Sequence, residues 1–151
     1  MERALQVLVA AIALPLVAWS TYVHSDYPRA EAVLPARAVG YLANLPGRKR
    51  LFCFDFGACS LALGLDGIQT FMDGRCDPFP LSVWQRYRTL IDARPGWSGI
   101  LSAYAITFVL APNDSPLARA VGGSGQWNRI YSDGANALFA RKSGTELTPP
   151  V

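Results

Sequence analysis

The sequence has little charge, and one long stretch near its start has none. Charged residues make up 17% of the chain, against roughly 25% in a typical soluble domain. Residues 4–23 read ALQVLVAAIALPLVAWSTYV and contain no charged side chain. A helix of that length spans roughly 30 Å, the thickness of a bilayer core. We therefore expect a transmembrane anchor over residues 4–23.

Two other interpretations of this stretch stay open. The short start MER, with a poor cleavage site at Ala18–Ser20, is compatible with a cleaved signal peptide. A buried helix of a soluble protein rarely runs this long without a polar face. Positive charges are more frequent after the stretch than before it, which by itself would favour a cytoplasmic domain. Because a long C-terminal domain translocates largely regardless of charge, we expect the domain outside the cytoplasm.

Several catalytic signatures are missing from the sequence. The single histidine, His24, falls in the segment 24–34 that we interpret as a linker. There is no C-x-x-C pair for zinc, and the glycine-containing runs GLDG and GGSG lack the lysine of a phosphate loop. The sequence has no stripe of basic residues interleaved with aromatic residues, so nothing in it indicates binding to nucleic acid. We expect no metal and no cofactor. The short basic run 47–50 is interpreted as a solvated turn, with contact to anionic lipid headgroups as the alternative.

Helical and strand-like segments alternate through the rest of the chain. Apolar runs predict strands over 50–57, 68–74 and 105–112, and 3.6-residue spacing predicts helices at 35–45, 58–65, 81–93, around 97–104 and after Ser115. Asp133–Gly134 between two apolar runs predicts a hairpin. The sequence thus predicts an α/β fold over 35–142, with a small, mostly parallel sheet, flanking helices and a C-terminal antiparallel hairpin. One transmembrane helix precedes it, and 143–151 is expected to be a flexible tail.

Polar residues follow each expected parallel strand. Because the carboxyl ends of parallel strands share one edge of a sheet, these residues are expected to be neighbours. They are Asp55, Asp73, Arg75, Asp77 and Asp114. One interpretation is structural, with Arg75 paired to Asp55 or Asp73 and Asp114 or Ser115 capping a helix. The others are a binding site for a sugar or lipid headgroup, and acid–base chemistry by paired carboxylates.

Cysteines and tryptophans supply two further hypotheses. Outside the cytoplasm, one pair among Cys53, Cys59 and Cys76 could form a disulfide, although buried free thiols fit equally well. Trp84 and Trp97 lie on helices that carry many large apolar side chains. They are candidate anchors of a protein–protein interface, and the alternative is that they pack on the sheet.

Three segments carry a resemblance to a known family. They are LFCFDFGACSLALGLDGIQTFMDGRCDPFPLSVWQRYRTL, GWSGILSAYAITFVLAPNDSPLARAV and WNRIYSDGANALFARK. The chain over 35–142 resembles the C-terminal extracytoplasmic domain of bacterial polytopic membrane proteins grouped with lipid-linked-sugar glycosyltransferases. The matching positions are Asp55, Gly57, Asp73, Gly74, Arg75, Asp77, Trp84, Tyr87, Trp97, Leu101, Tyr104, Pro116, Leu117, Trp127, Tyr131, Asp133 and Arg141. Ala58 departs from the family's second glycine.

The resemblance brings no active site to this chain. It implies that the family's catalytic acid lies in an early loop between membrane helices. This sequence offers one candidate membrane helix, which corresponds to the last membrane helix of the polytopic relatives. The chain is then a free-standing single-pass relative or a fragment. We expect a protein of the bacterial inner membrane with a periplasmic domain, acting as a non-catalytic accessory or binding subunit of a larger membrane complex. The alternative is the C-terminal domain of a glycosyltransferase-like protein that helps to recognise a lipid-linked sugar or polysaccharide.

Overall fold

The computed structural model describes residues 34–75 and 79–142. The chain separates into two units, 1–34 and 35–151, and the fold described below belongs to the second. The expected anchor over 4–23, most of the linker and the tail lie outside the described residues. Within the described ranges, no helix is both long enough and apolar enough to cross a membrane.

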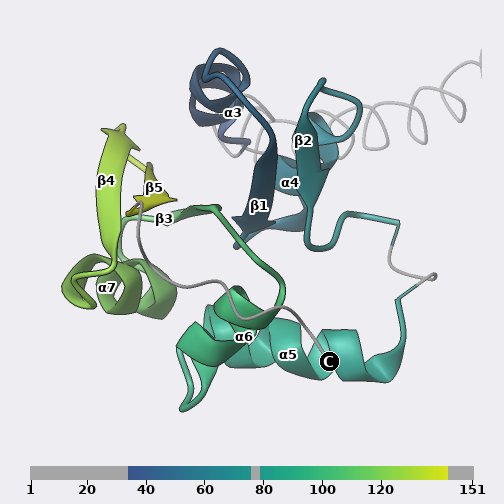
Figure 1. Ribbon diagram of the computed structural model, residues 1–151, viewed down its shortest axis with the longest axis vertical. Coiled ribbons are helices and arrows are strands. Elements are labelled where there is room, and N and C mark those ends of the chain that lie inside the picture. The colour runs from purple at the N-terminus through teal and green to yellow at the C-terminus, as the bar shows by residue number, and fades with distance from the viewer. Residues whose placement is uncertain (1–33, 76–78, 143–151) are drawn as a thin grey trace, which may run out of the picture. The chain divides into compact units, whose positions relative to one another are not determined.

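A five-stranded sheet forms the centre of the domain, in the order β2-β1-β3-β5-β4 (Figure 1). β1 pairs in parallel with β2 and with β3, whereas β5 runs antiparallel to both β3 and β4. The α/β class and the C-terminal hairpin are as expected. The sheet is mixed, with equal numbers of parallel and antiparallel pairings, because the hairpin adds two strands beside only three parallel ones. The strands are β1 Lys49–Cys53, β2 Ile68–Thr70, β3 Phe108–Pro112, β4 Trp127–Ser132 and β5 Asn136–Arg141.

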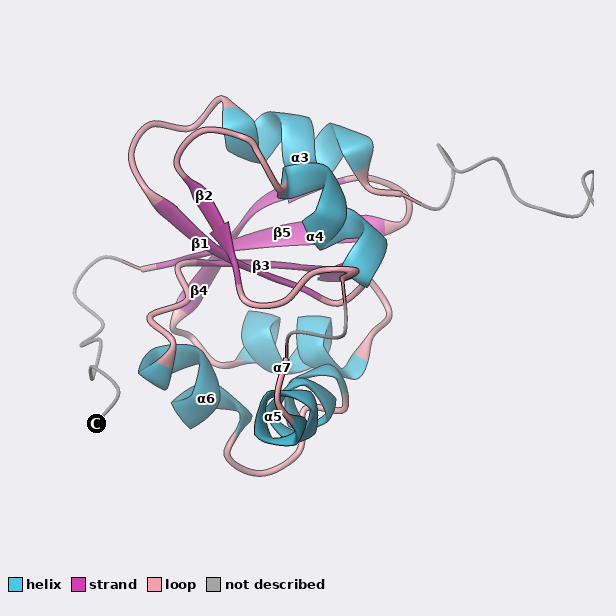
Figure 2. Ribbon diagram, turned by 90° about the vertical axis from the view of Figure 1, so that its right-hand side faces the viewer, coloured by secondary structure: helices cyan, strands magenta, loops and turns pink. Residues whose placement is uncertain are grey.

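Helices cover both faces of the sheet. Figure 2 shows α3 and α4 above the strands and α5, α6 and α7 below them. The apolar faces of the helices point inward: Ala38 and Leu42 of α3 are fully buried on one side, as are Leu90 of α5 and Leu117 of α7 on the other. The helices are α3 Ala36–Ala43, α4 Phe56–Ala62, α5 Leu81–Ile91, α6 Trp97–Ala103 and α7 Pro116–Gly123.

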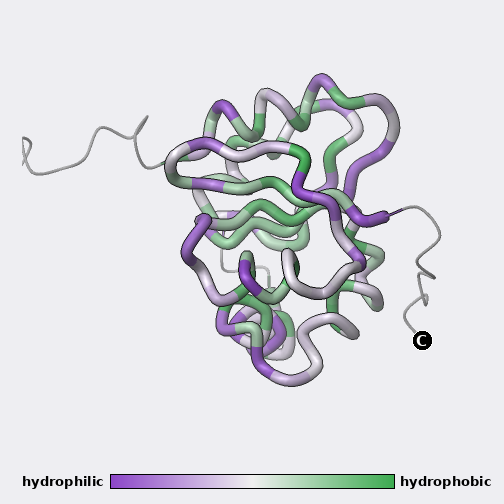
Figure 3. The backbone as a smooth tube through the Cα atoms, turned by 90° about the vertical axis from the view of Figure 1, so that its left-hand side faces the viewer, coloured by the Kyte–Doolittle hydropathy of each residue, from purple (hydrophilic) through white to green (hydrophobic). Residues whose placement is uncertain are grey.

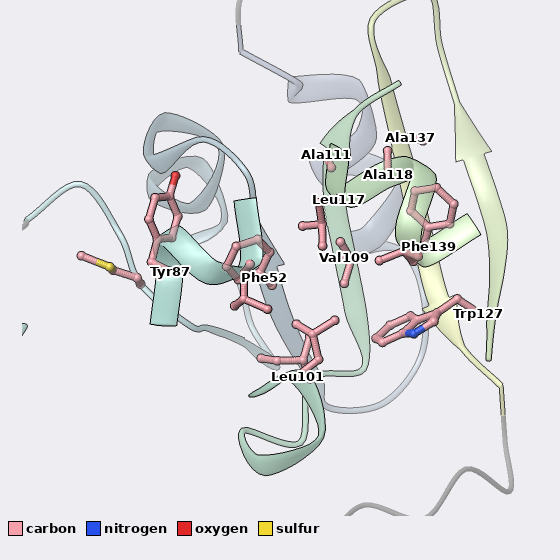
Figure 4. Close-up of a cluster of buried hydrophobic side chains, with 14 residues drawn as sticks. Phe52, Tyr87, Leu101, Val109, Ala111, Leu117, Ala118, Trp127, Ala137 and Phe139 are labelled. Atoms are coloured by element: carbon pink, nitrogen blue, oxygen red, sulfur yellow. The ribbon is translucent and has the colours of Figure 1, made fainter. Parts of the chain in front are cut away.

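The central strands are buried on both faces, which explains their continuous apolar sequence. Leu51 and Phe52 are neighbours in β1 that face opposite layers, and neither is exposed to solvent. The strands accordingly form the hydrophobic centre of the backbone trace in Figure 3. Below the sheet, the larger apolar cluster extends from Tyr87 through Phe52 and Val109 to Phe139 (Figure 4).

Side-chain caps set the starts of two helices, and the strands are shorter than the apolar runs predicted, with β2 ending at Thr70 and β3 beginning at Phe108. The strand predicted over 50–57 ends at Cys53, because Asp55 caps α4 by accepting a hydrogen bond from the Ala58 amide at 3.2 Å. Of the two cap candidates predicted for α7, Asp114 and Ser115, the cap is Ser115, whose hydroxyl oxygen accepts from the Ala118 amide at 3.1 Å.

The order of the strands defines where a ligand would approach. The chain leaves β1 through α4 on one face to reach β2, and returns through α5 and α6 on the other face to reach β3. From the carboxyl end of β1 the chain turns to one face of the sheet, through α4, whereas from the carboxyl end of β3 it turns to the other face, through α7. In open α/β sheets ligands bind outside such a point.

Candidate functional site

The candidate site is the edge of the sheet where the parallel strands β1, β2 and β3 end. The loops after these strands contain Asp55, then Asp73 and Arg75, and then Asp114. Asp77, the fifth residue of the predicted cluster, lies outside the described residues.

Asp73 and Arg75 form a local ion pair. Arg75 donates from Nε to Asp73 Oδ1 at 3.0 Å and from Nη2 to Oδ2 at 2.8 Å, and its backbone amide donates to Oδ1 at 3.0 Å. The Asp73 side chain is buried, whereas the Arg75 side chain is largely exposed. The hydrogen bond from the Arg75 side chain is the main reason that the pKa of Asp73 is lowered. The predicted ion pair of Arg75 is thus made with Asp73, and it fixes a turn.

Asp55 is exposed and stays apart from that pair. Its carboxylate caps α4, as described above, and bonds to neither Asp73 nor Arg75. The loop after β2 meets α4 through a different contact, in which the Gly74 amide donates to Ser60 Oγ at 3.1 Å. A Cβ atom at Gly74 would lie 2.8 Å from that oxygen, so the close approach requires glycine at this position.

Tyr87 lies on α5, on the opposite face of the sheet from α4, and its side chain also reaches the carboxyl edge. Its hydroxyl donates to the Phe54 carbonyl at the end of β1, and its ring stacks on Phe56 with 4.6 Å between centroids. Burial, together with the negative charge of Asp55, raises the pKa of Tyr87 to about 12. The helical pattern identified Tyr87 only as part of a buried face. The available signal was the hydroxyl itself, since a buried tyrosine usually needs a hydrogen-bond partner.

The loop after β3 is tied to the hairpin. The Asn113 side-chain amide donates to the Asp133 carbonyl at 2.8 Å, and Ser132 Oγ donates to Asn113 Oδ1 at 3.1 Å. Asp133 Oδ1 in turn accepts from the amides of Ala135 and Asn136, at 2.9 and 2.7 Å. The Asn136 amide is the main cause of the lowered pKa of Asp133. The Asp-Gly signal predicted the turn but gave no indication of its link to Asn113.

The polar residues of this edge therefore form several separate structural contacts. Asp73 holds a turn and Asp55 caps a helix, and Asp114 is exposed with its carbonyl bound by Arg119. In residues 34–75 and 79–142, no three acidic, histidine or cysteine side chains gather closely enough to hold a metal ion. The exposed carboxylates of Asp55 and Asp114 are available as hydrogen-bond acceptors for a polar ligand.

A disulfide joins β1 to α4. Cys53 and Cys59 are both buried, and their Cα atoms lie 5.6 Å apart. Cys76 falls outside the described residues.

Trp84 and Trp97 are half-buried and pack against the cluster below the sheet. The ring of Trp84 meets Phe56 edge-on at 5.4 Å. Each tryptophan thus contributes to the core and also presents part of its surface to solvent.

Comparison with known proteins adds no relative. No family model matches the chain. No curated protein matches it either.

Proposed function

We propose that the protein is a membrane-anchored, extracytoplasmic α/β domain that serves as a non-catalytic accessory or binding subunit of a larger membrane complex. The observation that carries this proposal is the uncharged run 4–23 directly before a domain with its own core. A run of that length and composition is typical of a transmembrane helix. The segment 24–34 then serves as a short tether between bilayer and domain.

The disulfide supports an extracytoplasmic position. Disulfides persist in oxidising compartments such as the bacterial periplasm and are rare in the cytosol. Cys53 and Cys59 are bonded within the core of the domain, where they connect a central strand to a helix. A bacterial inner-membrane protein with its domain in the periplasm would form this bond after translocation.

The contacts at the carboxyl edge support a scaffold role for its acids. The buried carboxylate of Asp73 is committed to Arg75, and the side chains of Asp55 and Ser115 cap helices. Groups held by such contacts keep the loops rigid. A carboxylate committed to such a contact, with its pKa lowered as that of Asp73 is, is poorly suited to general acid–base work near neutral pH.

Purification of tagged full-length protein in a mild detergent tests the proposal. We expect the protein to be extracted from membranes together with a membrane protein in fixed ratio. Replacing Trp84 and Trp97 by leucine keeps apolar contact with the core and removes the aromatic anchors, so the partner should be lost. Tyr41→Leu, at an exposed aromatic on α3, is the control. Recovery of a monomer from the soluble fraction, with no partner, would refute the proposal.

The alternative function is recognition of a lipid-linked sugar or polysaccharide by the C-terminal domain of a glycosyltransferase-like membrane protein. It is favoured by the resemblance over 35–142 and by the exposed carboxylates of Asp55 and Asp114 at the edge where α/β sheets bind ligands. The genomic context separates the two. Further membrane helices in the same gene product support the alternative, whereas helices supplied by other, co-purifying proteins support the accessory subunit.

A further inference from the structure

A second polar feature lies on the face of the sheet that carries α5, α6 and α7. It is a hollow of about 150 Å³ toward the amino ends of β1 and β3. One water molecule occupies about 30 Å³ in the liquid, so the hollow has room for more than a single water. Its lining residues are Arg50, Gln69, Thr70, Phe71, Tyr104 and Ile106.

Arg50 is held in place beside this hollow by the sheet. Its backbone amide donates to Thr107 Oγ1 at 2.9 Å, and its carbonyl accepts from the Thr107 amide at 2.9 Å. Among the residues that the structure describes, the guanidinium donates one hydrogen bond, from Nη1 to the Tyr104 carbonyl at 3.3 Å. A guanidinium has five N–H donors, so most of those of Arg50 remain available.

A second arginine, Arg86, contacts the side chain of Tyr104, whereas Arg50 contacts its backbone. Arg86 on α5 donates to the Tyr104 hydroxyl, and its guanidinium carbon lies 5.4 Å from the centre of the ring. Within the described residues the ion pairs are Arg75–Asp73 and Arg94–Asp92. Neither Arg50 nor Arg86 has a carboxylate partner in that part of the chain, so two positively charged side chains lie beside Tyr104.

We propose that this hollow binds a phosphate group. The fork of Arg50 and the side-chain amide of Gln69, which both line the hollow, offer more N–H groups than the two oxygens of a carboxylate would use, and Arg86 adds a positive charge beside Tyr104. Arginine matches phosphate geometry through paired hydrogen bonds. Phe71 and Tyr104, whose rings meet edge-on at 4.7 Å, form the apolar wall for whatever carries the phosphate. The proposal goes beyond the accessory role and does not depend on the anchor.

Amide chemical shifts of the full-length protein in a non-ionic detergent test the site. Inorganic phosphate is titrated first, and a short-chain phosphatidic acid second. We expect saturable shifts concentrated at Gln69, Phe71 and Tyr104. Saturation by both compounds identifies the phosphate group alone as sufficient, whereas saturation by the lipid alone identifies a headgroup site. Shifts of the same size with chloride, or shifts spread evenly over the surface, would overturn the proposal.

Arg50→Gln supplies the decisive comparison. Loss of charged hydrogen bonds should weaken phosphate binding by about tenfold or more. Arg50→Lys keeps the charge without the fork and should fall between wild type and Arg50→Gln. Arg129→Gln is the matched control, because Arg129 is also an exposed strand arginine without a carboxylate partner among the described residues, and lies instead over Phe139. Equal weakening in the Arg129 and Arg50 variants would contradict a specific site.

Discussion

At the scale of single residues, side chains that looked like a binding cluster act as supports for the backbone. Asp73 is the clearest case, because its buried carboxylate accepts hydrogen bonds from both the side chain and the backbone amide of Arg75. Asp133 supports the hairpin turn in a similar way, by accepting hydrogen bonds from the backbone amides of Ala135 and Asn136. Such residues hold loops in place at the edge where a ligand or partner would approach.

Arg75→Ala is expected to lower the melting temperature, because it leaves the buried Asp73 carboxylate without its cation. Thermal unfolding followed by circular dichroism measures the effect. Arg94→Ala is the control: both partners of the Arg94–Asp92 pair are exposed, so its loss should change little. An unchanged melting temperature in Arg75→Ala, combined with loss of a partner, would make Arg75 a binding residue instead.

Acid should destabilise the domain through Asp73 and Asp133. In the folded protein the pKa of each lies below that of an ordinary aspartate, about 3.9, so the folded state favours their charged forms. Their stabilisation is fully present above the unfolded pKa and is lost as the pH falls below about 4 through the folded pKa values. Urea unfolding between neutral pH and pH 3 should show this fall. The fall should shrink when Asp73 and Asp133 are replaced by asparagine, and an undiminished fall would contradict this account.

Ala93 adopts a backbone conformation that favours glycine. Its φ is 49°, and it ends α5 with bonds from the Ala93 amide to the Leu90 carbonyl and from the Arg94 amide to the Thr89 carbonyl. We expect Ala93→Gly to stabilise the domain by about 0.5–1 kcal/mol, since relief of strain exceeds the entropic cost of glycine. Urea unfolding checks the sign. Ala120→Gly, inside α7, should instead destabilise by about 1 kcal/mol, and equal losses in both variants would contradict the argument.

At the scale of elements, the disulfide fixes α4 against the end of β1. Cys53 and Cys59 are six positions apart, so the bond closes a short loop. For a loop of that length, the chain-entropy model gives a stabilisation of roughly 2 kcal/mol. Reduction should therefore shift the urea midpoint of the wild-type protein downward. The double variant Cys53→Ala, Cys59→Ala should not respond to reductant, and a wild type equally unresponsive would rule out the bond.

Elements with strong local signals were predictable from the sequence. The 3.6-residue spacing of Val83, Tyr87 and Leu90 marked α5, and Asp133–Gly134 marked the hairpin. The ends of elements that depend on a single hydrogen bond were not predictable. At Asp55, for example, the apolar run continues past the residue that caps α4. The grouping of the acids depends on distances set by the tertiary fold. Sequence order placed them at one edge but could not show that the carboxylates of Asp55 and Asp73 each make their own local contact.

At the scale of the whole molecule, helices on both faces enclose a sheet, and the core described for the domain draws on residues from Ala38 to Phe139. A domain with such a core is a compact unit that a membrane segment can carry. The uncharged run 4–23 and the tether 24–34 would then position the domain near the bilayer. The proposed phosphate hollow and the half-buried tryptophans are the surfaces through which it would act there.

Protease accessibility in intact spheroplasts tests the central claim most directly. The full-length protein carries a C-terminal tag and is followed by immunoblot after added protease, with a cytoplasmic marker as the control for lysis. An anchored, extracytoplasmic domain predicts that the protein sediments with the spheroplasts and loses its tag while the marker stays intact. Retention of the tag until the spheroplasts are lysed, or release of the domain into the medium as a soluble product, would contradict the account.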